Sequence, residues 1–166
     1  MELHVFNMAN CSFMQELKIL SDRAADKTRN ISKSYAGDVL VFCVSYERKV
    51  GVDIEKQTKR APETMKHFVD KFSTFQIKDV PKAIDEKWFY RAWTAMESFF
   101  KLTGAGFSTE KSFILDLKQQ SILRDGIKVA SLSHFEIDDY VICLCSNTTF
   151  TKQNIKLSFY GWKEIL

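Results

Sequence analysis

The stretch Gly51-Val52-Asp53-Ile54-Glu55 places two carboxylates at positions i and i+2 of an apolar, β-prone run. Side chains alternate between the two faces of a strand, so Asp53 and Glu55 share one face while Val52 and Ile54 point toward a core. Two adjacent carboxylates repel each other unless a cation or solvent relieves the repulsion. The stretch therefore predicts either a cation-binding strand or an exposed polar strand face.

A second stretch, Trp93-Thr94-Ala95-Met96-Glu97-Ser98-Phe99-Phe100-Lys101-Leu102-Thr103-Gly104, has the spacing of an apolar helix that ends at glycine. Glu97 is four residues from both Trp93 and Lys101, so the three side chains share one helical face. An ordinary surface ion pair would account for Glu97 and Lys101. However, Glu97 lies among large apolar residues, where a carboxylate needs a partner. Together with the two strand carboxylates it predicts a site for one hard divalent cation with room for phosphate oxygens.

The hydrophobic periodicity predicts an α+β chain, with helices in the middle and antiparallel strands on either side of them. We expect helices over residues 12–29 and 62–72, and a longer helical region that begins near residues 79–81 and ends at Gly104. The turn at residues 47–49 predicts a hairpin of the strands on either side of it. The expected strands cover residues 3–6, 39–46, 50–55, 113–117, 121–123, 128–135, 140–145 and 155–159.

Composition excludes several classes of function. The 166 residues fit one domain or two packed lobes, and the 45% apolar content allows a full core. A net charge of +3 is too small to indicate nucleic-acid binding. No apolar run approaches the roughly 20 residues of a membrane span, and the first residues lack the pattern of a signal peptide. We expect a cytoplasmic protein in which the cysteines are reduced and mostly buried, namely Cys11, Cys43, Cys143 and Cys145.

The two stretches, with Asn30-Ile31-Ser32-Lys33-Ser34 upstream of them, resemble the Sfp-type 4′-phosphopantetheinyl transferases. That family carries the paired motifs (V/I)-G-(V/I)-D-(I/V)-E and W-(S/T)-x-K-E-(S/A)-x-x-K-x-x-G, and N-(I/L)-S-H-S before them. Here Glu97 follows Glu55 by 42 residues, and the resemblance runs from Asn30 nearly to the C-terminus. Three motifs in order, on fitting element types, are more specific than any one of them.

The resemblance implies an enzyme that moves the phosphopantetheine arm of coenzyme A onto a serine of an apo acyl or peptidyl carrier protein and releases 3′,5′-ADP. By analogy, Glu97 would help to deprotonate the carrier serine, and Lys101 would neutralise or protonate the departing phosphate. Ser32 and Lys33 would lie near the coenzyme A phosphates. The Mg²⁺ ligands implied by the resemblance are Asp53, Glu55 and Glu97.

The sequence departs from the family pattern at several points. Met96 stands where the family has lysine, which is expected to remove a cation near the metal, and Lys33 stands where the family has histidine. Residues 72–76 lack the family's glutamate. Only 50 residues precede Gly51, so the expected organisation is a truncated N-terminal lobe (1–50) and a C-terminal metal-binding lobe (51–166). A homo-oligomer would cover the apolar surface that an incomplete lobe leaves.

Two alternatives to a carrier-protein transferase stay open on the sequence. The first is a non-catalytic relative that binds coenzyme A or a carrier protein as a regulator or scaffold, which Met96, Lys33 and the short first lobe favour. The second is an unrelated α+β protein that carries the motifs by chance. Retention of Asp53, Glu55 and Glu97 favours the enzyme, because degenerate enzymes often lose metal ligands.

Overall fold

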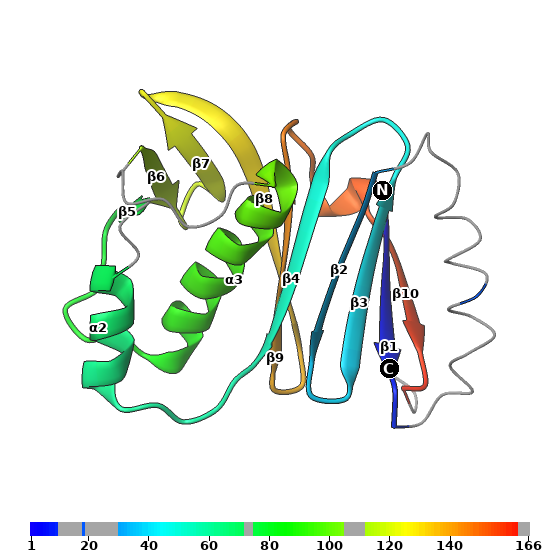
Figure 1. Cartoon of the computed structure of the whole chain (residues 1–166), viewed down its shortest axis with the longest axis horizontal. Coiled ribbons are helices and arrows are strands. Elements are labelled where there is room, and N and C mark those ends of the chain that lie inside the picture. Colours follow the sequence, from blue (N-terminus) through cyan, green and yellow to red (C-terminus); the bar gives the residue numbers. More distant parts are fainter. Residues whose placement is uncertain (10–17, 19–29, 72–74, 105–111, 163–166) are drawn as a thin grey trace.

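The computed structural model describes residues 1–9, 18, 30–71, 75–104 and 112–162. Its strands form two sheets, one at each end of the molecule in Figure 1. The first sheet has the order β10-β1-β3-β2, in which β1 pairs in parallel with β10 and the other neighbours are antiparallel. Its strands are β1 (Glu2–Asn7), β2 (Asn30–Ala36), β3 (Val39–Ser45) and β10 (Lys156–Tyr160).

The second sheet has the order β4-β9-β8-β7-β6-β5 and carries the two longer helices on one side. Its strands are β4 (Val50–Lys56), β5 (Phe75–Ile77), β6 (Phe113–Asp116), β7 (Ser121–Arg124), β8 (Ile127–Ile137) and β9 (Tyr140–Ser146). The helices are α2 (Pro62–Lys71), α3 (Glu86–Thr103) and the short 3-10 helix η1 (Lys152–Asn154). None of the described helices is both long and apolar enough to cross a membrane.

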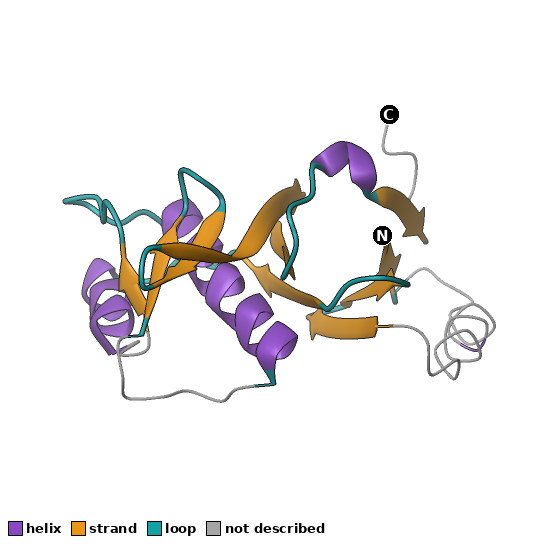
Figure 2. Cartoon of the chain, turned by 90° about the horizontal axis from the view of Figure 1, so that it is seen from above, coloured by secondary structure: helices purple, strands orange, loops and turns teal. Residues whose placement is uncertain are grey.

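The sheets meet where β2 lies beside β4 (Figure 1). Seen from above, the strands near the two termini curve around a shared interior (Figure 2). Alternating residues of β4 explain this packing, because Val50, Val52 and Ile54 point into an apolar cluster shared with Leu3 and Val41 of the first sheet. The opposite face of β4 is therefore left to meet α3.

Helix α3 begins at a defined signal and packs its apolar face on the second sheet. The side chain of Asp85 accepts a hydrogen bond from the backbone N–H of Trp88, which satisfies one of the free donors of the first turn. Gly104 ends the helix in the left-handed conformation, with φ of 69°. Met96 and Phe99 are buried against strand residues that include Leu115 and Cys143.

The α+β class and most of the expected elements are confirmed, but two expectations are wrong. The strands at residues 39–46 and 50–55 do not form a hairpin, because β3 lies between β1 and β2 whereas β4 pairs with β9. Residues 79–81 do not start the long helix, since α3 begins at Glu86. The expected helix at residues 12–29 lies, apart from residue 18, outside the described residues.

The division into lobes at residues 50 and 51 stays a prediction. Strand β10, near the end of the described chain, pairs with β1 in the first sheet. The backbone N–H of Lys156, the first residue of β10, donates a hydrogen bond to the carbonyl oxygen of Met1. Both sheets therefore contain residues that follow Gly51.

Candidate active site between strand β4 and helix α3

Gly51 sets the distance between β4 and α3. A Cβ at this position would lie 1.9 Å from the carbonyl oxygen of Ser98 and 2.7 Å from the backbone nitrogen of Leu102. Because no side chain separates the two elements there, the helix backbone rests directly on the strand. The next two residues of the same strand face, Asp53 and Glu55, are thereby brought against side chains of α3.

Asp53 is a buried carboxylate with one bonded oxygen and one unbonded oxygen. Its Oδ1 accepts hydrogen bonds from Lys101 Nζ at 2.7 Å and from Ser34 Oγ at 2.8 Å. Its Oδ2 is buried and has no hydrogen-bond partner among the described residues. Burial raises the pKa of the Asp53 carboxyl, and the charge and hydrogen bond of Lys101 and the Ser34 hydroxyl oppose that rise.

Glu55 and Glu97 lie close enough to Asp53 to feel its charge. Glu55 Oε1 accepts a hydrogen bond of 3.0 Å from Trp93 Nε1, so the helix positions this side chain too. Burial and then the Asp53 charge raise the pKa of Glu55. Burial, Asp53 and, more weakly, Glu55 raise the pKa of Glu97, whereas Lys101 lowers it. The three carboxylates therefore share one region of negative potential, which Lys101 and, at Glu55, Arg60 partly offset.

The three carboxylates do not converge on a ready-made metal cage. Within the described ranges, no group of three acidic, histidine or cysteine side chains has a metal-binding arrangement. Lys101 instead forms an ion pair with Asp53 rather than with its helical neighbour Glu97. The donor set nevertheless fits a hard cation, because all its donors are carboxylate oxygens and the buried Oδ2 of Asp53 lacks the partner it needs.

Comparisons with known proteins identify the family of the segment that contains β4 and α3. The family model of the 4′-phosphopantetheinyl transferase superfamily matches residues 49–148, which include both β4 and α3. The chain belongs to this superfamily.

Individual relatives match between about half and two thirds of the chain. It is 32% identical over 114 residues to the 4′-phosphopantetheinyl transferase Sfp of Bacillus subtilis, which is 64% of this chain and 50% of that protein. It is 28% identical over 92 residues to the 4′-phosphopantetheinyl transferase HetI of Nostoc sp., which is 54% of this chain and 39% of that protein. The chain thus spans about half the length, or less, of the curated relatives it matches.

The motif at residues 30–34 on β2 contributes Ser34, a residue to which the resemblance assigns no role, and its neighbours Ser32 and Lys33 lie differently. Ser32 accepts a hydrogen bond of 2.9 Å from the backbone N–H of Val52, so its hydroxyl joins β2 to β4. Lys33 is exposed on the other face of the strand. Ser34, on the Ser32 face, is the residue that reaches Asp53. The alternation of strand side chains was the signal that could have found it.

Met96 does not face the carboxylates. It is 2% exposed and packs in the apolar cluster between α3 and the second sheet. The expectation that this residue marks a lost cation beside the metal is therefore wrong for this chain, since a lysine here would have to enter the core. Glu97, the next residue, lies on a different side of the helix, as 100° per residue requires.

Replacing Met96 with lysine is expected to destabilise the fold by several kcal/mol, because an ammonium group would be buried without a partner. Met96→Leu is the matched control and should cost less than about 1.5 kcal/mol, since it nearly preserves volume and polarity. Urea denaturation of both variants measures the difference. Equal stability of Met96→Lys and the wild type would show that the position opens toward solvent.

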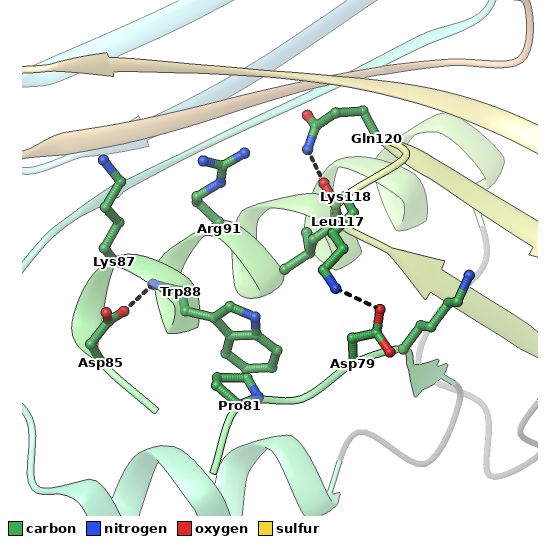
Figure 3. A pocket seen from close by; sticks show the side chains of 10 residues that line it. Asp79, Pro81, Asp85, Lys87, Trp88, Arg91, Leu117, Lys118 and Gln120 are labelled. Carbon is green, nitrogen blue, oxygen red and sulfur yellow. Dashed lines mark hydrogen bonds and ion pairs between the residues drawn. The ribbon is translucent and has the colours of Figure 1, made fainter. Parts of the chain in front are cut away.

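A pocket beside the first turns of α3 lies away from this site. Its volume is about 590 Å³, and Trp88, Arg91, Leu117 and Lys118 are among the residues around it (Figure 3). It contains none of the predicted site residues. A much smaller pocket of about 60 Å³ touches Glu55 and is lined by aromatic side chains, namely Phe68, Phe89, Tyr90 and Trp93.

Proposed function

We propose that this chain transfers the 4′-phosphopantetheine arm of coenzyme A to a serine hydroxyl of an apo acyl or peptidyl carrier protein. The observation that carries the proposal is the contact of Asp53 with Lys101 inside the segment that matches the superfamily. It joins the two motifs that the resemblance pairs, and it leaves one buried carboxylate oxygen for a cation. The names of Sfp and HetI state the same activity for those relatives.

In this proposal Asp53, Glu55 and Glu97 would hold Mg²⁺. The ion would supply positive charge to the pyrophosphate of coenzyme A. Glu97 accepts the proton of the carrier serine, directly or through water, and its raised pKa suits it to that role. The serine oxygen forms a bond to the phosphorus next to the pantetheine arm, and the bond from that phosphorus to the 3′,5′-ADP oxygen breaks. Lys101, whose side chain is 31% exposed, neutralises charge on the leaving phosphate.

The hydrogen bond of the Ser32 hydroxyl limits what that side chain can contribute to the proposed coenzyme A contacts of β2. The Ser32 hydroxyl accepts a hydrogen bond from the Val52 N–H, so its side chain is expected to hold β2 against β4. Any contact of Ser32 with a phosphate would therefore use its backbone. Lys33 is free to reach solvent from the exposed face. Cys43, Cys143 and Cys145 are buried free thiols, and we propose a reduced, cytoplasmic setting for the chain. Cys11 lies outside the described residues.

Intact-protein mass spectrometry tests the proposed activity directly. An apo carrier protein incubated with this chain, coenzyme A and Mg²⁺ is expected to gain one phosphopantetheine, and EDTA should prevent the gain. Asp53→Asn is the matched negative control. If several acyl and peptidyl carrier proteins remain unmodified while the wild-type chain is folded, the transferase proposal fails.

A non-catalytic role in binding coenzyme A or a carrier protein is the second candidate. It is favoured by the absence of a ready-made three-ligand arrangement among the described residues. Calorimetric titration with coenzyme A separates the two: binding without transfer supports the second candidate, whereas transfer that Asp53→Asn abolishes excludes it.

Metal binding in this site is expected to weaken as the pH falls. Exposed carboxyl groups take up protons at about pH 4, and the weakening should begin at a higher pH than that. The pKa values of Asp53, Glu55 and Glu97 are all raised, so their protonated forms appear at higher pH, and a cation needs the deprotonated forms. Titration with Mn²⁺ in buffers from neutral to mildly acidic measures the trend. An affinity that stays constant down to about pH 4 would contradict it.

A further inference from the structure

Ser34, Lys101 and Asp53 form a closed triangle of hydrogen bonds. Lys101 Nζ lies 2.7 Å from Ser34 Oγ and 2.7 Å from Asp53 Oδ1, and Ser34 Oγ lies 2.8 Å from the same Oδ1. The three residues come from β2, β4 and α3, so the triangle joins the two sheets and the helix at one point. Each of the three groups has its position fixed by the other two.

The hydroxyl of Ser34 has a specific function in this triangle. A serine oxygen can donate one hydrogen bond and accept others, whereas a lysine ammonium only donates and an ionised carboxylate only accepts. Ser34 therefore donates to Asp53 and accepts from Lys101, which draws both donors to the same carboxylate oxygen. The other oxygen, Oδ2, is left buried without a partner.

We propose that Ser34 is a positioning residue that holds the Lys101 ammonium on Oδ1 of Asp53 and so reserves Oδ2 for the divalent cation. This inference rests on the proposed function. Without the hydroxyl, the ammonium is free to move between the two carboxylate oxygens and to compete with the cation for Oδ2. With the hydroxyl in place, one buried aspartate serves the lysine and the metal at once.

The location of Ser34 supports this role over simple packing. It is on β2, whose neighbouring same-face residue Ser32 bonds the Val52 N–H of β4 and so fixes the two strands next to each other. Ser34 is 8% exposed, and its bonds go to charged groups rather than to backbone. Partners of metal-ligating carboxylates commonly change metal affinity by about 10- to 100-fold when they are removed.

Mn²⁺ binding to the whole chain, measured by the electron paramagnetic resonance signal of free Mn²⁺ without coenzyme A, tests the inference. Ser34→Ala is expected to weaken Mn²⁺ binding at least about 10-fold. Ser34→Cys, which keeps the volume but bonds weakly, should weaken it too, whereas Ser34→Thr should restore most of the affinity. Ser131→Ala is the control for loss of a buried strand hydroxyl, because the Ser131 hydroxyl on β8 has no hydrogen-bond partner among the described residues, and it should leave Mn²⁺ affinity within about twofold of wild type.

A double variant shows whether Ser34 acts through Lys101. In a Lys101→Met background no ammonium competes for Asp53, so adding Ser34→Ala should change the Mn²⁺ affinity by less than about twofold. Undiminished Mn²⁺ binding by Ser34→Ala and Ser34→Cys, with wild-type binding intact, would overturn the inference and leave the proposed function standing. No Mn²⁺ binding by the wild type beyond that of Asp53→Asn would instead overturn the metal-dependent function, and this inference with it.

Discussion

Glu97→Gln is expected to lower the rate of phosphopantetheine transfer by at least about 100-fold, while the variant unfolds at a temperature no lower than that of the wild type. The substitution keeps the shape of the side chain but removes its charge. Transfer is lost because the proposed base and metal ligand is gone. Stability is kept because the carboxylates of Asp53 and Glu55, which raise the pKa of Glu97 together with burial, no longer repel it.

The opposite directions of the two effects make this prediction specific. A residue that only supports the fold would lose activity and stability together, whereas functional charge clusters are commonly retained at some cost in stability. Glu86→Gln, the same change in the first turn of α3, is the control and should leave transfer unchanged. Transfer by Glu97→Gln at more than about a tenth of the wild-type rate would remove Glu97 from the proposed chemistry.

Local sequence patterns predicted the elements of the site because their signals lie within a few residues. Alternation put Asp53 on the opposite face of β4 from Val52, and the structure confirms that arrangement. The burial of Asp53 excludes the alternative of an exposed polar strand face. Helical spacing put Glu97 and Lys101 on one face. The alternative of an ordinary ion pair between them does not describe the structure, because Lys101 pairs with Asp53 of β4 instead.

Strand pairing was the part that local patterns could not supply. The turn at residues 47–49 predicted a hairpin, yet β4 pairs with β9, about ninety residues further along the chain. Nothing in a short window shows which distant strand will offer the complementary apolar face. The contribution of Ser34 depends on the same non-local packing, because it appears only when β2 is placed beside β4.

The start of α3 was mistaken for a related reason. Proline is common in the first turn of a helix, so Pro81 favoured a helix start near residues 79–81. However, Asp79 adopts a positive φ of 54°, which does not fit a helix. The true cap is Asp85, whose side chain bonds the backbone of Trp88. The capping hydrogen bond of Asp85, four residues after Pro81, marks the start that the helix uses.

Gly51→Ala is expected to destabilise the fold by about 3 kcal/mol or more and to abolish transfer, although it adds a single methyl group distant from any proton transfer. The added carbon would collide with backbone atoms of Ser98 and Leu102, which cannot rotate away as a side chain can. To relieve the contact, α3 must move off β4. That movement separates Lys101 from Asp53, an interaction which depends on a distance of 2.7 Å.

Gly126→Ala separates this effect from the general cost of replacing a glycine. Gly126 has a φ of 76° and open space around its missing Cβ, so its replacement should cost only the roughly 1–2 kcal/mol of a left-handed backbone. Urea denaturation compares the stabilities, and Mn²⁺ binding under folding conditions reports the site. Gly51→Ala should lose both stability and Mn²⁺ binding. Gly126→Ala should lose only part of its stability and keep Mn²⁺ binding. If Gly51→Ala keeps wild-type Mn²⁺ affinity, the close approach of α3 to β4 does not set the geometry of the carboxylates.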